Sequence, residues 1–354
     1  MKKLRYGIIG CGGISGKHLT GYSALADDVE IVACCDIIEE RMDNVAKKYN
    51  IPKKYRDYKD LLVDPEIDFV SVCLPNCLHN PVTCEALKVG KHVHCEKPMA
   101  LNTAQAQEML DTSRKTCKKL MIGLNNRFTP QSQFVKQYIA EGNLGEIYYA
   151  RCGWVRRAGM AIAGWFTDKE QSGGGPLIDL GVHYIDLVMY FMNYPKVRDV
   201  SARTYCKFGA NLDLRQTYTG AYTRLDLPYN VEDFAVGFIN LENDACISFE
   251  ISWASNIERE KLFYEILGTN GGIKMETQPG GPFFKIFSRI GDQLVDIEPK
   301  LRMDAYQGEF AHFVESIRTG KDPTISVPEQ GVEMMTLIDG IYRSADSRQP
   351  YFFK

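Results

Sequence analysis

Three features that would indicate other classes of protein are missing from this sequence of 354 residues. It has no basic excess, because 42 lysines and arginines face 45 aspartates and glutamates, so we expect no nucleic-acid partner. It has no apolar run long enough to cross a bilayer, so we expect no membrane partner. Its charged start, Met1–Arg5, leads into a short stretch broken by glycines, which favours a strand and turn over a signal peptide.

Paired cysteine spacing is also missing. The eleven cysteines are odd in number, scattered, and never form a C-x-x-C pair. This spacing argues against a disulfide framework and against a zinc site. We therefore expect reduced thiols, a cytoplasmic location and no metal centre.

Through residue 124, the sequence alternates short apolar runs with helical stretches. This order, with short connections, is typical of a doubly wound parallel α/β sheet. The expected strands are Tyr6–Ile9, Ile31–Cys35, Phe69–Leu74, His92–Cys95 and Leu120–Leu124. The expected helices are Ser15–Leu25, Glu39–Tyr49, Pro81–Val89 and Thr103–Lys118.

After Pro130 the pattern changes to runs of strands joined by short turns, which predicts an antiparallel sheet. We therefore expect an α/β Rossmann domain over residues 1–124 and an α+β domain with a large, mainly antiparallel open sheet over residues 125–354. One helix is expected from Pro176 to Tyr190. Two closing helices are expected, Ala305–Thr319 and Pro328–Ala345, and packing of these helices on the first domain is left open.

A glycine-rich turn, Gly10-Cys11-Gly12-Gly13-Ile14-Ser15, follows the first expected strand and opens a helix. Gly10 permits a tight turn, Gly12 permits close approach of a pyrophosphate, and the helix N-terminus attracts the phosphates. Asp36 ends the next strand, where a carboxylate can bind the ribose hydroxyls of a dinucleotide. The alternative is a simple turn with a helix-capping aspartate. A carboxylate repels a 2′-phosphate, so NAD is favoured over NADP.

A second motif, His94-Cys95-Glu96-Lys97-Pro98, ends the strand His92–Cys95. Ligands bind at the carboxyl ends of parallel strands, so Lys97 is placed where it can donate to a substrate hydroxyl. Taken alone, a lysine after a strand is more often solvated surface.

The third motif runs from Gly173 to Asp186, where Pro176 follows three glycines that we interpret as a flexible hinge. Asp179 and His183 are four residues apart, so on a helix they share one face. The pair can be a general acid and base, two metal ligands, or a structural contact. Acid–base chemistry is preferred over metal, since no further ligand has a suitable spacing. Asp186 is placed to hydrogen-bond the imidazole of His183.

At these three motifs, and along essentially the whole chain, the sequence resembles the Gfo/Idh/MocA oxidoreductases, which include glucose–fructose oxidoreductase and inositol dehydrogenase. The resemblance also covers Leu74-Pro75-Asn76 with His79, and Asn126-Arg127-Phe128. It implies a homodimer or homotetramer formed through the C-terminal sheet, and a substrate held between the nicotinamide and a helix of the second domain. The third glycine of the phosphate fingerprint is Ser15 here, a small residue that leaves the interpretation unchanged.

The resemblance also assigns roles to residues. Lys97 would polarise the reacting hydroxyl, His183 would take or return its proton, and Asp179 would orient the sugar. The implied cofactor-binding residues are Gly10, Gly12, Gly13, Ile14, Asp36, Pro75, Asn76, His79, Glu96, Lys97 and Pro98. The implied substrate-binding residues are Lys97, Arg127, Trp165, Asp179, His183 and Tyr184.

Together these features predict an NAD-dependent enzyme that transfers hydride between nicotinamide and a secondary ring hydroxyl of a sugar, a cyclitol such as inositol, or a glycoside. One alternative keeps NAD bound and cleaves a glycoside by transient oxidation and elimination. Another is a non-catalytic regulator that binds the dinucleotide on the same fold. Such a regulator is expected to lack the lysine or the histidine, and this chain has both.

Overall fold

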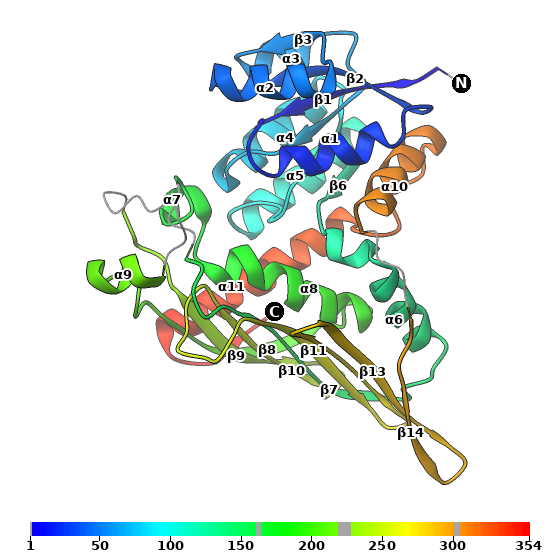
Figure 1. The fold of residues 1–354 in the computed structure, drawn as a ribbon, viewed down its shortest axis with the longest axis vertical. Coiled ribbons are helices and arrows are strands. Elements are labelled where there is room, and N and C mark those ends of the chain that lie inside the picture. Colours follow the sequence, from blue (N-terminus) through cyan, green and yellow to red (C-terminus); the bar gives the residue numbers. More distant parts are fainter. Residues whose placement is uncertain (1, 161–163, 219–227, 301–304) are drawn as a thin grey trace. The chain divides into compact units, whose positions relative to one another are not determined.

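The computed structural model describes residues 2–160, 164–218, 228–300 and 305–354. The chain forms two compact units (Figure 1). The first unit contains Met1–Thr129 and Met303–Met335, and the second contains Pro130–Arg302 and Thr336–Lys354.

The first unit is built on a six-stranded sheet in the order β3-β2-β1-β4-β5-β6. All neighbouring strands are parallel. The strands are β1 (Leu4–Ile9), β2 (Val29–Cys35), β3 (Lys53–Tyr55), β4 (Phe69–Val72), β5 (His92–Cys95) and β6 (Leu120–Ile122). Five of the six were expected, since apolar runs of this kind are typical of strands covered on both faces. The short polar strand β3 was not expected.

Helices and 3-10 turns precede, connect or follow these strands in the first unit. They are α1 (Ser15–Ser23), α2 (Glu39–Tyr49), α3 (Tyr58–Val63), η1 (Asn76–Leu78), α4 (His79–Lys88), α5 (Thr103–Thr116), η2 (Asn125–Phe128) and α10 (Ala305–Thr319). The bounds of α2 agree with the sequence prediction. Two acidic residues begin this helix, two lysines end it, and Asn50 closes it in a left-handed conformation at φ 54°.

An aromatic core holds α10 against the sheet of the first unit. Phe310 of α10 lies with its ring centroid 4.8 Å from that of Tyr22 in α1, and Tyr22 in turn contacts Phe69 of β4. A Cβ atom at Gly21 would lie 1.9 Å from the Phe310 ring, so only glycine permits this approach of α10 to α1. Phe310 thus joins a helix near the end of the sequence to the Rossmann core.

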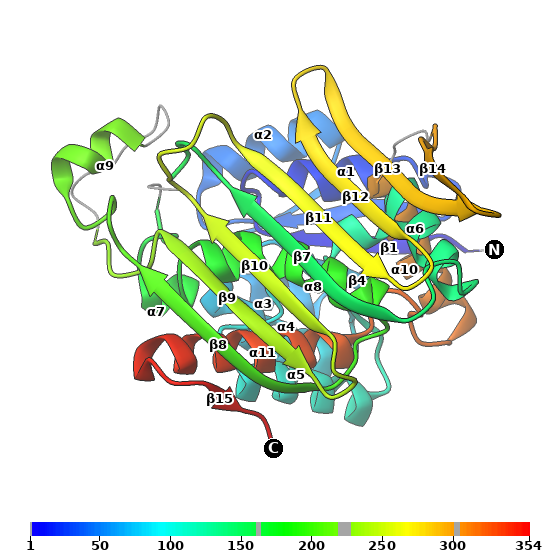
Figure 2. The same ribbon diagram turned by 90° about the horizontal axis from the view of Figure 1, so that it is seen from below.

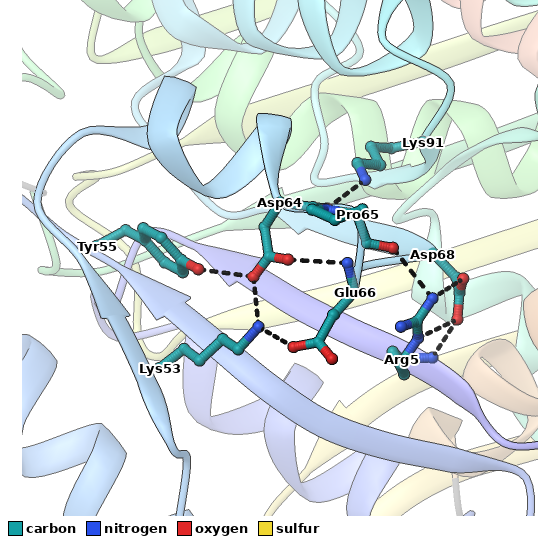
Figure 3. Close-up of polar contacts among 8 residues, drawn as sticks. All are labelled: Arg5, Lys53, Tyr55, Asp64, Pro65, Glu66, Asp68 and Lys91. Atoms are coloured by element: carbon teal, nitrogen blue, oxygen red, sulfur yellow. Dashed lines mark hydrogen bonds and ion pairs between the residues drawn. The ribbon is translucent and has the colours of Figure 1, made fainter.

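The amino ends of the parallel strands carry a cluster of opposite charges around the turn that precedes β4 (Figure 3). Lys53 Nζ donates to Asp64 Oδ2 at 2.7 Å, and the Tyr55 hydroxyl donates to the same oxygen at 2.7 Å. Burial acts to raise the pKa of Asp64, but these two donors outweigh it and lower the pKa to about 2. Arg5 pairs with Asp68 at 3.0 Å. Charged groups at this end of the sheet thus bind one another.

The second unit is built on a nine-stranded sheet in the order β14-β13-β12-β11-β7-β10-β9-β8-β15. Only the β7–β10 pair is parallel among the paired strands of the described ranges. The strands are β7 (Ile147–Val155), β8 (Val197–Tyr205), β9 (Phe234–Leu241), β10 (Cys246–Ser252), β11 (Lys261–Gly268), β12 (Gly272–Gln278), β13 (Gly281–Ile290), β14 (Gln293–Ile297) and β15 (Tyr351–Phe352). The expected large, mainly antiparallel sheet is confirmed.

The helical elements of the second unit include α8, which lies on one face of this sheet and contacts β7 and β11 (Figure 2). They are α6 (Pro130–Ala140), α7 (Lys169–Ser172), η3 (Leu177–Gly181), α8 (Val182–Phe191) and α9 (Leu212–Tyr218). A further helix, α11 (Pro328–Ser347), contributes residues to both units. The prediction of one regular helix from Pro176 to Tyr190 is wrong at its start, because η3 is a π-helical turn.

Two further findings concern the whole of the described chain. No helix in the described ranges has both the length and the hydropathy that crossing a membrane requires. All eleven cysteines lie within the described ranges, and none of them forms a disulfide.

Candidate active site

The glycine-rich turn between β1 and α1 has the geometry that the phosphates of a dinucleotide need. Gly10 has φ +96°, and a Cβ atom there would lie 2.2 Å from the carbonyl oxygen of Cys73. Cβ atoms at Gly12 and Gly13 would meet nothing within 4 Å, so the main chain at these positions borders open space. Helix α1 carries no capping side chain and no acid in its first turn, among the residues described there. Its N-terminal N–H groups therefore suit a pyrophosphate.

Asp36 lies at the carboxyl end of β2 beside this turn. One of its carboxylate oxygens accepts the Cys11 N–H at 2.7 Å, and the other accepts the Ile38 N–H at 2.8 Å. These two bonds orient the carboxylate, and a carboxylate has about four acceptor sites, so it can still receive ribose hydroxyls. The turn and Asp36 together fit NAD.

The Glu96-Lys97-Pro98 motif follows β5 at the same carboxyl edge of the sheet. Lys97 is half-buried, and its main-chain N–H donates to Glu96 Oε2 at 3.1 Å. The other Glu96 oxygen, Oε1, lies 2.8 Å from Nε2 of His18 and accepts a hydrogen bond from it. Burial acts to raise the pKa of Glu96, but the His18 hydrogen bond and the charges of His18, Lys97 and His94 together outweigh it and lower the pKa to about 2. Glu96 is therefore ionised next to Lys97.

Residues after β4 form the predicted rim of the cofactor site. Pro75 precedes η1, and Asn76 is buried within it. His79 is 1% exposed, with Nδ1 2.7 Å from the Pro98 carbonyl oxygen and Nε2 2.9 Å from that of Leu74. The structure therefore brings His79 to the Lys97–Pro98 segment through main-chain contacts. A direct contact between His79 and the cofactor stays a prediction.

A second buried network lies beneath Glu96, and sequence reasoning missed it. His94 is fully buried, with Nδ1 3.0 Å from the Tyr22 hydroxyl and Nε2 3.2 Å from Glu309 Oε1. Burial, with the charge of Glu96 adding to it, raises the pKa of Glu309 to about 8. Glu309 comes from α10, more than 200 residues from His94. Nothing local in the sequence indicates this pairing.

In the second unit, close packing requires two of the three glycines before η3. Cβ atoms at Gly174 and Gly175 would lie 1.9 Å from the Tyr342 hydroxyl and 2.0 Å from the Glu232 carbonyl oxygen. The buried Glu232 carboxylate accepts the N–H groups of Gly175 at 2.9 Å and Leu177 at 3.1 Å. It also accepts the Tyr342 hydroxyl at 2.9 Å. The glycines thus let Glu232 cap the segment that carries Asp179 and His183.

Asp179 lies in the π-helical turn, and His183 and Tyr184 lie in the first turn of α8. The Asp179 carboxylate accepts the indole N–H of Trp253, which is fully buried, at 3.0 Å. The ring of Trp154 lies 5.9 Å from that of His183 and 5.8 Å from that of Tyr184, between centroids. Single π-helical turns inside helices occur frequently at functional sites. Sequence reasoning missed Trp253, whose distance along the chain hides its contact.

For three other residues, the observed contacts do not test the roles that the sequence predicts. Arg127 is fully buried in the first unit and donates to the Gln330 side chain of α11. Trp165 is half-buried and stacks on Phe166, with ring centroids 4.0 Å apart. Asp186 accepts the hydroxyl of Tyr194. The substrate contacts predicted for Arg127 and Trp165, and the bond from Asp186 to His183, stay predictions.

The dinucleotide turn, the acid after β2 and the lysine after β5 define a nicotinamide-dependent oxidoreductase of the Rossmann class. The chain matches the oxidoreductase family with an NAD-binding Rossmann fold over residues 4–124. It matches the C-terminal alpha/beta domain of the same family over residues 136–352. The chain therefore belongs to the Gfo/Idh/MocA family of NAD-dependent oxidoreductases that act on CH–OH groups, and the predictions of family, NAD cofactor and enzyme class are confirmed.

Relatives of known activity extend this result. The chain is 34% identical to D-glucoside 3-dehydrogenase of Escherichia coli (strain K12) over 352 residues, 97% of this chain and 96% of the relative. It is 30% identical to myo-inositol 2-dehydrogenase of Thermotoga maritima over 189 residues, 53% of this chain and 55% of the relative. The solved structure of levoglucosan dehydrogenase in complex with NADH has the same fold, with a TM-score of 0.86 at 21% identity and full coverage of both chains.

Proposed function

We propose that this protein oxidises a secondary ring hydroxyl of a sugar glycoside with NAD, and that carbon 3 is the site of oxidation. The observation that carries the proposal is the nearly full-length similarity to D-glucoside 3-dehydrogenase. Lysine, aspartate and histidine stand at the three positions that the chemistry needs, Lys97, Asp179 and His183. A cyclitol is the next candidate substrate, since a myo-inositol 2-dehydrogenase is also a relative.

The roles of the residues follow from the chemistry of alcohol oxidation. When NAD is bound, its nicotinamide ring accepts the hydride that leaves the hydroxyl-bearing carbon. His183 takes the hydroxyl proton, and the ammonium of Lys97 stabilises the negative charge that develops on the oxygen. Asp179, oriented by the Trp253 indole, binds a hydroxyl of the sugar. Gly10, Gly12, Gly13, Ile14 and Asp36 hold the dinucleotide.

The test measures NADH absorbance at 340 nm with the purified protein, NAD, and a panel of methyl glycosides, free hexoses and inositols. Activity is expected with glycosides, and NMR of the product should place the new carbonyl at carbon 3. Lys97→Met and His183→Gln should each lower kcat by roughly 10²- to 10⁴-fold. A matched control is His312→Gln, because His312 accepts the N–H groups of Thr324 and Ile325 in another part of the first unit.

Three results would contradict the proposal. Full turnover in both the Lys97 and the His183 variants would remove the assigned mechanism. Release of an aglycone without net NADH would favour glycoside cleavage by elimination. Oxidation of inositol alone would move the substrate to the cyclitols.

We also propose that the protein forms a homodimer or homotetramer through the open face of its large sheet. Phe238 is 52% exposed and Tyr205 is 41% exposed, and both lie on the face that carries Phe234, with Tyr205 paired to Phe234 in register. Exposed aromatic side chains on a sheet are typical of an interaction surface. Light scattering after gel filtration should give a mass above that of one chain. Phe238→Lys should reduce that mass, and a monomeric wild type would overturn this proposal.

A further inference from the structure

The two residues that flank Lys97 in the chain are each tied to a buried histidine. Glu96, on the amino side, is bound by His18 of helix α1. Pro98, on the carboxyl side, presents its carbonyl oxygen to His79 of helix α4. His18 is 2% exposed and His79 is 1% exposed. Both contacts lie within the first unit.

At neutral pH only one of the two carbonyl oxygens beside His79 can receive its ring proton. Both of its ring nitrogens face carbonyl oxygens, which only accept hydrogen bonds. Burial lowers the pKa of His79, so the ring is neutral and has one N–H to donate. The Nδ1 contact to Pro98 is 2.7 Å long and the Nε2 contact to Leu74 is 2.9 Å long. We assign the proton to Nδ1 on the shorter distance, so His79 donates to Pro98.

The contacts of His18 form a chain that ends at the main chain of Lys97. Its Nδ1 lies 2.9 Å from the hydroxyl of Ser71, which is fully buried in β4. Its Nε2 lies 2.8 Å from Glu96 Oε1, and an ionised carboxylate only accepts, so Nε2 is the donor. The second oxygen of Glu96 receives the N–H of Lys97. His18 therefore fixes the carboxylate that holds the backbone at Lys97.

We propose that His18 and His79 are positioning residues that fix the backbone on both sides of Lys97 and thereby aim its ammonium at the reacting hydroxyl. The lysine side chain has four rotatable bonds, so its tip is placed only as well as its Cα is placed. Misplacing a catalytic group by about 1 Å can cost roughly 10²-fold in rate. The inference rests on the proposed function for its kinetic consequence, whereas the contacts themselves are independent of the substrate.

Two pairs of substitutions separate positioning from general stability, because asparagine and glutamine place their amide at different ring positions. His79→Asn retains a donor near Nδ1 and so near Pro98, while His79→Gln places its donor near Nε2 and Leu74. His18→Gln retains a donor near Nε2 and so near Glu96, while His18→Asn places its amide toward Ser71.

The favoured substitution is therefore reversed between the two sites. At position 79 the asparagine variant should keep a kcat at least about tenfold above that of the glutamine variant. At position 18 the glutamine variant should have the higher kcat, by a similar factor. The same order at both positions, or equal kcat values within each pair, would overturn the proposal.

A second readout does not depend on turnover. The lysines are reductively methylated with ¹³C-formaldehyde, and the Lys97 resonance is assigned by its loss in Lys97→Arg. This resonance should shift or broaden in His79→Gln and His18→Asn, and stay near its wild-type position in His79→Asn and His18→Gln. The control His312→Asn disturbs a histidine that also binds main-chain groups, and it should leave the Lys97 resonance in place even if the protein unfolds at a lower temperature.

The two readouts also distinguish the two proposals. A wild-type protein that oxidises no glycoside or cyclitol would overturn the proposed function, while the Lys97 resonance would still report on His18 and His79. A Lys97 resonance that stays unmoved in all four variants would overturn the positioning role even if glycoside oxidation is found.

Discussion

The amino and carboxyl ends of the same six strands hold their charges in different ways. At the amino ends, Lys53 binds Asp64 and Arg5 binds Asp68, so opposite charges pair close to the surface. At the carboxyl ends, Asp36 is held by main-chain N–H groups and Glu96 by a buried histidine. The first arrangement ties neighbouring strands and turns together. The second orients single groups for a ligand, so substitutions at the two ends should have different consequences.

The largest expected effect is on the fold at the carboxyl end, from Gly10→Ala. The new methyl group would lie 2.2 Å from a carbonyl oxygen, at a φ of +96° that side chains rarely adopt. Strain and overpacking together should lower the free energy of unfolding by roughly 3 kcal/mol or more. Urea denaturation measures this change.

The control for Gly10→Ala is Gly12→Ala, whose Cβ would meet nothing within 4 Å. It should change the free energy of unfolding by less than about 0.5 kcal/mol and weaken NAD binding. Equal stability losses in the two variants would show that the turn does not depend on the Gly10 conformation.

An intermediate effect is expected on the pH dependence of stability, from Glu309→Gln beneath the carboxyl ends. The pKa of Glu309 is raised from 4.5 to about 8 in the folded protein, so folding takes up a proton between these pH values. Relative to the glutamine variant, the wild type should therefore lose about 2–3 kcal/mol of stability as the pH rises from 5 to 8, because the opposite contributions of His79, His92, His94 and His312 are common to both proteins. The glutamine variant lacks this loss.

Urea denaturation of both proteins at pH 5 and pH 8 provides the measurement. At pH 8 the glutamine variant should equal or exceed the wild type in stability. At pH 5 the wild type should be the more stable of the two. Because Glu96 titrates near pH 2, it does not contribute within this window. Parallel stability curves would contradict a protonated Glu309.

The smallest effect is expected at the amino ends, from Asp64→Asn. The pKa of Asp64 is lowered from 3.8 to about 2, so its ionised form stabilises the fold above about pH 4 and this contribution is lost as the pH falls toward 2. At pH 7 the melting temperature should fall by less than about 3 °C, because pairs near the surface contribute little. Glycoside oxidation should be unchanged. A loss of turnover without a loss of stability would contradict the contrast between the two ends.

Residues whose partners are close in sequence were predictable. Helix α2 begins and ends at Glu39 and Tyr49, as expected, because its acidic start, basic end and Asn50 cap are local signals. Gly10 and Asp36 were also predictable, since a glycine turn after one strand and an acid after the next form a recognisable spacing.

Residues whose partners are distant in sequence were not predictable. The cap that Glu232 and Tyr342 form on the glycines before η3 brings together segments 57 and 110 residues apart. The glycines were interpreted as a hinge because sequence does not show what packs against them. The three-residue strand β3 was missed because Lys53, Lys54 and Tyr55 lack an apolar pattern, and only pairing with β2 makes them a strand.

The sequence by itself determined the fold class, the cofactor turn, the choice of NAD and the candidate groups Lys97, Asp179 and His183, because each depends on a local motif or an apolar period. Tertiary structure decided what holds those groups: His18 and His79 beside Lys97, Trp253 on Asp179, and Glu232 on the segment before His183. Hydrogen bonds of this kind join side chains by distance in space. No local sequence pattern indicates which donor will meet which acceptor.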